Sequence, residues 1–230
     1  MKIALFDIDG TLVWTHGAGR RAMQRALLGE AGAAGPEDHR YDGKTDKQIV
    51  REALRHEGFA DAEVNAKMDG VLERYILELA REFEADDHGA ELLPGVELVL
   101  SAIEARADIM LGLLTGNLVR GAERKLRAVG VDPSRFVVGA FGSDHEMRDQ
   151  LPGIARQRAS TYLGRPVPGD ACVIIGDTPS DVACARPIGA RTIAVATGSF
   201  DVRALAACAP DAVFADLRDT NAFVRAIVNA

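Results

Sequence analysis

The chain has 230 residues, of which 47% are hydrophobic and 27% charged, as in an ordinary globular protein. Its 27 lysines and arginines against 34 aspartates and glutamates give a net charge of −7, which argues against a general nucleic-acid or anionic-membrane binder. No apolar run approaches the length needed to cross a bilayer. Asp7 interrupts the first apolar run too early for a secretory signal, and the three cysteines form no C-x-x-C pair. We therefore expect a cytoplasmic protein with reduced thiols.

Short apolar runs recur along the chain and predict the strands of one sheet. The first covers residues 3–6. The others cover 109–114, 136–138, 172–175, 192–195 and 212–214. Strands that are apolar throughout and separated by helical patterns are typical of a parallel sheet covered on both faces. The sequence therefore predicts an α/β fold with a doubly wound parallel sheet.

Residues 15–93 break this rhythm, because they carry helical patterns and no convincing strand lies between the first run and the second. Helices are predicted over 17–32, 45–54 and 61–84. An insertion of this length between one strand and the rest is typical of a second structural unit. We therefore expect a helical cap at 15–93, inserted into a core made of residues 1–14 and 94–230.

Polar residues follow three of the predicted strands at the point where each ends. They are Asp7 and Asp9, then Thr115, Gly116 and Asn117, and finally Asp177 and Asp181. In open α/β sheets ligands bind outside the carboxyl ends of the strands, so we expect these groups to share a site. Two carboxylates about 4 Å apart repel by roughly 4 kcal/mol at an effective dielectric near 20, so the cluster would hold protons or recruit a cation. Because its ligands are all oxygens, Mg²⁺ is favoured over zinc.

The motifs that carry these residues resemble those of a known family. DIDGT at 7–11, TGN at 115–117 and GDTPSD at 176–181 are similar to the motifs of the haloacid-dehalogenase-like (HAD) superfamily. The nearest resemblance is to its phosphoglycolate-phosphatase-like members, which have a helical cap over a Rossmann-like core. It implies a magnesium-dependent phosphatase that hydrolyses a small phosphorylated metabolite, a phosphate monoester, through an aspartyl-phosphate intermediate.

The resemblance also implies roles for the four aspartates. Asp7 would be the nucleophile, and Asp9 the general acid to the leaving alkoxide and then the general base to water. Asp7 and Asp177 would bind the metal, together with the main-chain carbonyl of Asp9, and Asp181 would be a second acidic group on the metal's water shell. Asp181 also suits the first turn of a helix that Thr178 would cap, and the two interpretations are compatible.

The phosphate would be held by the strand end at 115–117 and by a basic residue. Thr115 and the amide of Gly116 suit phosphate oxygens, with Asn117 as a further candidate, although Thr115 or Asn117 could instead cap the helix that follows.

The third motif of the family is normally a lysine, and this sequence departs from that pattern. Lys125 is the only lysine between Thr115 and Asp177, and it lies on a predicted helix too close to Thr115. We therefore expect Arg148, just before another predicted helix, to take this place. Arg156 and Arg158 are the fallbacks.

The stretch YDGKTD at 41–46 would bring Lys44 or Thr45 over the site for substrate selection, although Thr45, three residues before Gln48, also fits the N-cap of a helix.

Other functions of the same fold remain open. A haloacid dehalogenase needs no metal and usually lacks the second acidic residue, here Asp9. A phosphomutase keeps both aspartates. A non-enzymatic phosphometabolite-binding protein would not need to retain Asp7, Asp9 and Asp177.

Overall fold

The computed structural model describes residues 1–84 and 88–230. Six strands of the described residues form one parallel sheet in the order β5-β4-β1-β6-β7-β8. They are β1 (Lys2–Phe6), β4 (Ile109–Thr115), β5 (Val138–Phe141), β6 (Cys172–Gly176), β7 (Arg191–Val195) and β8 (Ala212–Phe214). The doubly wound α/β expectation is confirmed, with β1 in the interior of the sheet and both of its neighbours parallel to it.

Helices cover both faces of this sheet. Their bounds are α4 (Val96–Glu104), α5 (Val119–Ala128), α6 (Leu151–Leu163), α7 (Pro179–Cys184), α8 (Val202–Ala206) and α9 (Thr220–Asn229). Side chains of a strand alternate between the faces, so Ala4 and Phe6 pack in the cluster that includes residues of α4, α5 and α9. Ile3 and Leu5 pack in the opposite cluster with residues of α6 and α7. Because the strands are apolar on both faces, helices pack against each face of the sheet.

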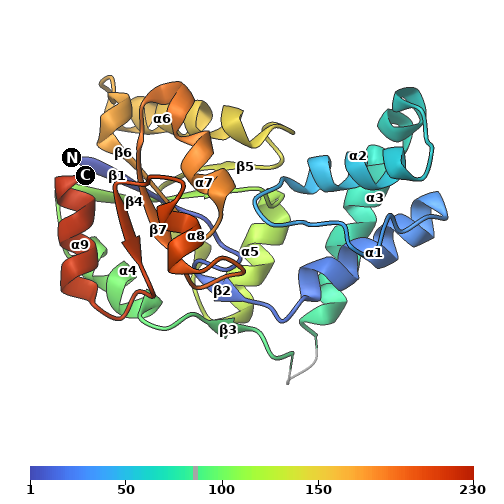
Figure 1. Ribbon diagram of the computed structural model, residues 1–230, viewed down its shortest axis with the longest axis horizontal. Coiled ribbons are helices and arrows are strands. Elements are labelled where there is room, and N and C mark those ends of the chain that lie inside the picture. The colour runs from blue at the N-terminus through green and yellow to red at the C-terminus, as the bar shows by residue number, and fades with distance from the viewer. Residues whose placement is uncertain (85–87) are drawn as a thin grey trace.

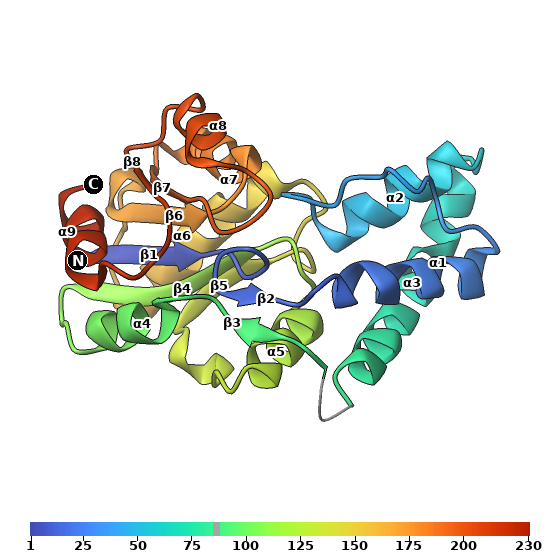
Figure 2. The ribbon, with the colours of Figure 1, turned by 60° about the horizontal axis from the view of Figure 1, so that its bottom comes forward.

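The helices inserted between β1 and α4, named the cap from here on, lie beside the sheet (Figures 1 and 2). The cap consists of α1 (Ala18–Ala31), α2 (Asp46–His56) and α3 (Asp61–Glu82), whose buried apolar side chains make a cluster of their own. The three helices predicted in this region are confirmed. Both chain ends lie at the opposite end of the molecule from these helices.

Two short strands join the cap to the sheet. β2 (Val13–Trp14) and β3 (Glu91–Leu92) pair antiparallel where the chain leaves the sheet and where it returns. The expectation that no strand lies between residues 6 and 109 was therefore wrong. Strands of two residues are too short to produce a periodic pattern, so the sequence alone does not reveal them. Residues 85–87 of the predicted cap lie outside the described residues.

The strand predicted at 136–138 is displaced along the chain. Residues Pro133–Arg135 form a 3₁₀ turn, η1, and the edge strand β5 begins at Val138. Phe136 packs against the core from the connecting loop, so its apolar character reflects burial and not strand pairing. The other 3₁₀ turns are η2 (Arg148–Gln150), η3 (Gly169–Ala171) and η4 (Arg186–Ile188).

No helix of the described residues has the length and apolar character needed to cross a membrane.

Candidate active site

The candidate site lies at the carboxyl ends of three adjacent strands. Asp7 follows β1, Thr115 ends β4 and Asp177 follows β6, and these strands are neighbours in the order β4-β1-β6. The amide of Asp7 donates to the carbonyl of Ile175 at 2.9 Å, which extends the pairing of β1 with β6 as far as the site. Residues far apart in sequence therefore meet here because parallel strands end at one edge of the sheet.

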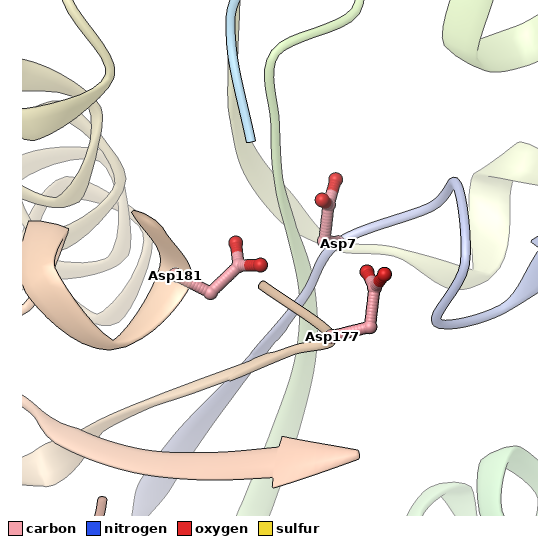
Figure 3. A group of neighbouring side chains, drawn as sticks. All are labelled: Asp7, Asp177 and Asp181. Carbon is pink, nitrogen blue, oxygen red and sulfur yellow. The ribbon is translucent and has the colours of Figure 1, made fainter. Parts of the chain in front are cut away.

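Three buried carboxylates form the centre of the site (Figure 3). One oxygen of each of Asp7, Asp177 and Asp181 lies within 4.8 Å of the others. The Arg148 guanidinium pairs with two of them, at 2.9 Å from Asp7 Oδ2 and in a still closer contact with Asp181 Oδ1. Three negative groups against one positive group leave an excess of buried negative charge if all are ionised.

The pKa values of two carboxyls respond to this excess. Burial raises the pKa of Asp7 from 3.8 to about 6, with repulsion from Asp181 and Asp9 adding to it and the Arg148 charge opposing it. Burial, followed by repulsion from Asp181 and Asp7, raises the pKa of Asp177 well above its ordinary value. Oxygen donors with surplus negative charge suit a hard divalent cation such as Mg²⁺, so these residues fit the expected metal.

Local sequence features hold this cluster in place. Gly10 has a φ of 76°, and a Cβ there would lie 2.4 Å from Asp177 Oδ2, so a larger residue would displace that carboxylate. The Thr11 hydroxyl donates to Asp177 Oδ1 at 3.1 Å. Thr178 is the N-cap of α7 in a capping box with Asp181, and its amide donates to Asp181 Oδ2 at 3.0 Å. The other oxygen of Asp181 is thereby left to Arg148.

The strand end at 115–117 is linked directly to Asp9. The Asn117 side-chain amide donates to Thr115 Oγ1 and to Asp9 Oδ2, each at 2.8 Å. Neither Thr115 nor Asn117 caps α5, whose N-cap is Leu118. That alternative interpretation was therefore wrong. The Leu118 amide instead donates to Asp46 Oδ2 at 2.8 Å, so a residue of the inserted helical cap accepts a hydrogen bond from the N-terminal end of α5.

The basic candidates separate into two groups. Arg148 lies in the acidic cluster and lines the cavity described below, and its Nε is buried without a hydrogen-bond partner among the described residues. Arg158 pairs with Asp144 at 2.7 Å, and neither it nor Arg156 is among the residues that line the cavity. Lys125, which the sequence interpretation set aside as too close to Thr115, lies at the site in another role, because its Nζ contacts both carboxylate oxygens of Asp9 at 2.8 and 2.7 Å. This contact was not predicted. A lysine on the buried stripe of an amphipathic helix is the signal that could have revealed it.

A cavity of about 390 Å³ opens over these groups and is lined by both the core and the cap. Lys44 lines it, with an ammonium that pairs with Glu52. Thr45 is fully buried and is the N-cap of α2, accepting from the Gln48 amide at 3.1 Å. The Gln48 side chain donates to Glu52 and so does not complete a capping box.

The cap rests on the core loops around the cavity. The Asp46 amide donates to the Gly116 carbonyl at 2.8 Å, and a Cβ on Gly116 would lie 2.0 Å from the Lys44 carbonyl oxygen. Sequence reasoning missed Asp46, because an acid in the first turn of a helix needs no other explanation. Burial raises its pKa to about 6, against the nearby Lys125 charge.

A second core loop, residues 143–146, receives three side chains from α2 and its N-cap. Thr45 Oγ1 donates to the Glu146 carbonyl at 2.5 Å, Lys47 Nζ donates to the Ser143 carbonyl at 2.9 Å, and Arg51 forms a bidentate pair with the Glu146 carboxylate. This loop leads directly into Arg148.

A doubly wound sheet with buried carboxylates at its carboxyl edge and a helical insertion above them defines an α/β enzyme with a site suited to a divalent cation. The sequence model of the haloacid dehalogenase-like hydrolases matches residues 1–189, and the chain belongs to this family.

Relatives agree with this assignment. The chain is 30% identical over 204 residues to a phosphoglycolate phosphatase of Rhodospirillum rubrum, covering 86% of this chain and 80% of that protein. It is 27% identical over 225 residues to phosphoglycolate phosphatase 1 of Pseudomonas aeruginosa, covering 95% and 78% of the two chains. The crystal structure of a hydrolase from Pseudomonas syringae has the same fold, with a TM-score of 0.74, 21% identity and 98% of each chain covered.

Proposed function

We propose that the chain is a magnesium-dependent phosphatase that hydrolyses a small-molecule phosphate monoester through an aspartyl-phosphate at Asp7. The observation that carries this proposal is the cluster of three buried carboxylates and the Arg148 guanidinium beneath a cavity that the cap helps to enclose. The names of the two bacterial relatives support a phosphate monoester as the substrate, and they make phosphoglycolate the first compound to test.

In the first half of the reaction the Asp7 carboxylate attacks the phosphorus and the bond from phosphorus to the ester oxygen breaks. The leaving alkoxide takes the proton of Asp9. Arg148 would bind phosphate oxygens, a role supported by its buried Nε without a partner among the described residues. Thr115 and the Gly116 amide would bind other oxygens of the same group.

In the second half Asp9 takes a proton from water, and the water oxygen attacks the phosphorus. The bond to Asp7 breaks and orthophosphate leaves. Asp9 is then protonated and Asp7 ionised, as at the start, so the cycle closes without another proton donor.

Asp7, Asp177 and Asp181 would hold the magnesium ion, together with the main-chain carbonyl of Asp9. The ion would supply positive charge that neutralises the phosphoryl group and the carboxylates around it. The Asp9 carboxylate is outside the group of three and is held by Lys125 and Asn117.

Two observations bear on substrate choice and location. Lys44 lines the cavity from the cap side, which supports a role in selecting the part of the substrate remote from the phosphate.

The free thiols of all three cysteines support the expected cytoplasmic location.

The decisive experiment compares the wild-type protein with Asp7→Asn on phosphoglycolate and a panel of phosphorylated metabolites. We expect wild-type orthophosphate release with Mg²⁺, its loss in EDTA, and its loss in Asp7→Asn. Asp69→Asn, in an exposed part of α3, is the matched control and should retain full activity.

Each competing function gives a different result. Isomerised product without orthophosphate would identify a phosphomutase, and turnover of a haloacid in EDTA would identify a dehalogenase. Binding without turnover of any compound would identify a non-enzymatic phosphometabolite-binding protein. Undiminished phosphatase activity in Asp7→Asn would refute the proposed nucleophile.

A further inference from the structure

Lys125 is a buried lysine whose hydrogen bonds are all directed at one end of the site. Its side chain is 5% exposed, and its ammonium donates to both oxygens of Asp9 and to Asn117 Oδ1 at 2.6 Å. An ammonium has three protons, so these contacts use its full capacity. The Asp9 side chain is by contrast 43% exposed and faces the cavity.

The surroundings of Lys125 come from both the core and the cap. Asn117 links it to the end of β4, because the Asn117 amide donates to Asp9 and to Thr115. On the cap side, a Cβ built on Gly19 of α1 would lie 3.3 Å from Lys125 Nζ. Removing a lysine from water is costly unless its charge is paired, and here the paired group is the carboxylate of Asp9.

We propose that Lys125 is a positioning residue for Asp9, which it holds with Asn117 in one orientation toward the leaving group. This inference rests on the proposed function, in which Asp9 gives its proton to the departing oxygen. As that proton leaves, negative charge develops on Asp9 beside the ammonium, so the contact is stronger in the transition state than before it. Each of the two proposed catalytic carboxylates thus has its own buried cation: Arg148 pairs with Asp7, and Lys125 pairs with Asp9.

A purely structural ion pair would have different consequences. If Lys125 only stabilised the fold around Asp9 and Asn117, its loss would lower activity on every substrate by the same factor. If it positions the proton donor, its loss matters in proportion to how much the leaving group needs a proton. Phenolate is a basic leaving group that needs one, whereas 2,4-dinitrophenolate departs readily without one.

The test measures kcat/KM for phenyl phosphate and for 2,4-dinitrophenyl phosphate, with Mg²⁺, in wild type and Lys125→Met. This ratio reports the steps up to cleavage of the ester and is insensitive to later hydrolysis of the aspartyl-phosphate. Since general acid catalysis contributes about 100-fold or more, we expect a loss of ~100-fold for phenyl phosphate and less than ~5-fold for the dinitrophenyl ester.

Arg120→Met is the matched control. Arg120 lies on the same helix, α5, and pairs with Glu73 of the cap at 2.7 Å, so its replacement removes a paired cation from this helix without touching Asp9. We expect its kcat/KM to be unchanged on both esters. Thermal unfolding of both variants shows whether they fold, and Lys125→Gln provides the same comparison if Lys125→Met does not.

Equal losses on the two esters, or no loss on either, would overturn this inference and leave the proposed function intact. Retained activity in Asp7→Asn would instead overturn the proposed function itself. The two failures are therefore separated by different variants.

Discussion

Replacing Asp7 by Asn should stabilise the metal-free protein at neutral pH, although it should abolish turnover. The folded protein raises the pKa of this buried carboxyl from 3.8 to about 6. A pKa shift of one unit corresponds to about 1.4 kcal/mol, so keeping Asp7 ionised in the folded state costs about 3 kcal/mol above pH 6. Asparagine removes the charge and keeps the size, so the free energy of unfolding should rise by up to ~3 kcal/mol.

The sign of the pH dependence follows from proton binding. Between pH 3.8 and about 6 the folded protein binds a proton at Asp7 that the unfolded chain has released. Wild-type stability from this carboxyl is therefore present below that window and is lost as the pH rises through it. The gain in the free energy of unfolding from Asp7→Asn should therefore be near zero at pH 3.8 and constant above about pH 6.

Urea unfolding of both proteins in EDTA, across this pH range, measures the difference directly. Asp69→Asn, on the exposed face of α3, should show no comparable gain. A difference that is the same at acid and neutral pH, or a variant less stable than wild type at neutral pH, would refute the electrostatic reasoning.

Two further predictions concern the metal and the contact between core and cap. Mg²⁺ at about ten times its dissociation constant should stabilise wild type by ~1.4 kcal/mol, seen as a higher Tm, and Asp177→Asn should lose most of this gain. A similar Mg²⁺ response in Asp177→Asn would show that the ion binds elsewhere. Gly116→Ala should raise KM and lower Tm, because its Cβ would overlap the Lys44 carbonyl, with an overpacking cost of about 1–3 kcal/mol. Gly153→Ala, where the nearest atom is 4.0 Å away, is the control, and equal effects of both substitutions would contradict this account.

The sheet could be predicted from the sequence because its strands are buried on both faces. β4 has a buried residue at every position from Ile109 to Thr115, so the apolar run and the strand nearly coincide. Register and edges are less visible, as β5 shows, because Phe136 is apolar for packing and not for pairing. The two-residue strands β2 and β3 are specified by pairing across the chain, which no local pattern records.

The candidate site was predictable where sequence motifs follow strands and unpredictable where helices contribute. Asp7, Thr115 and Asp177 could be placed together because parallel strands end at one edge. Lys125 and Asp46 lie on helices, where a charged residue has an ordinary explanation at the surface or in a first turn. Their contacts depend on how α5 and the cap pack against the strand ends, and this packing is a tertiary property.

The loop at 143–146 lies between α2 of the cap and the residue that reaches the buried carboxylates, Arg148. Thr45, Lys47 and Arg51 attach it to the cap, and two residues further along the chain Arg148 reaches the carboxylates. Swinging α2 outward would break these attachments and free the backbone that carries the guanidinium. Opening of the cavity to solvent and loss of support for Arg148 would thus depend on the same short stretch of chain.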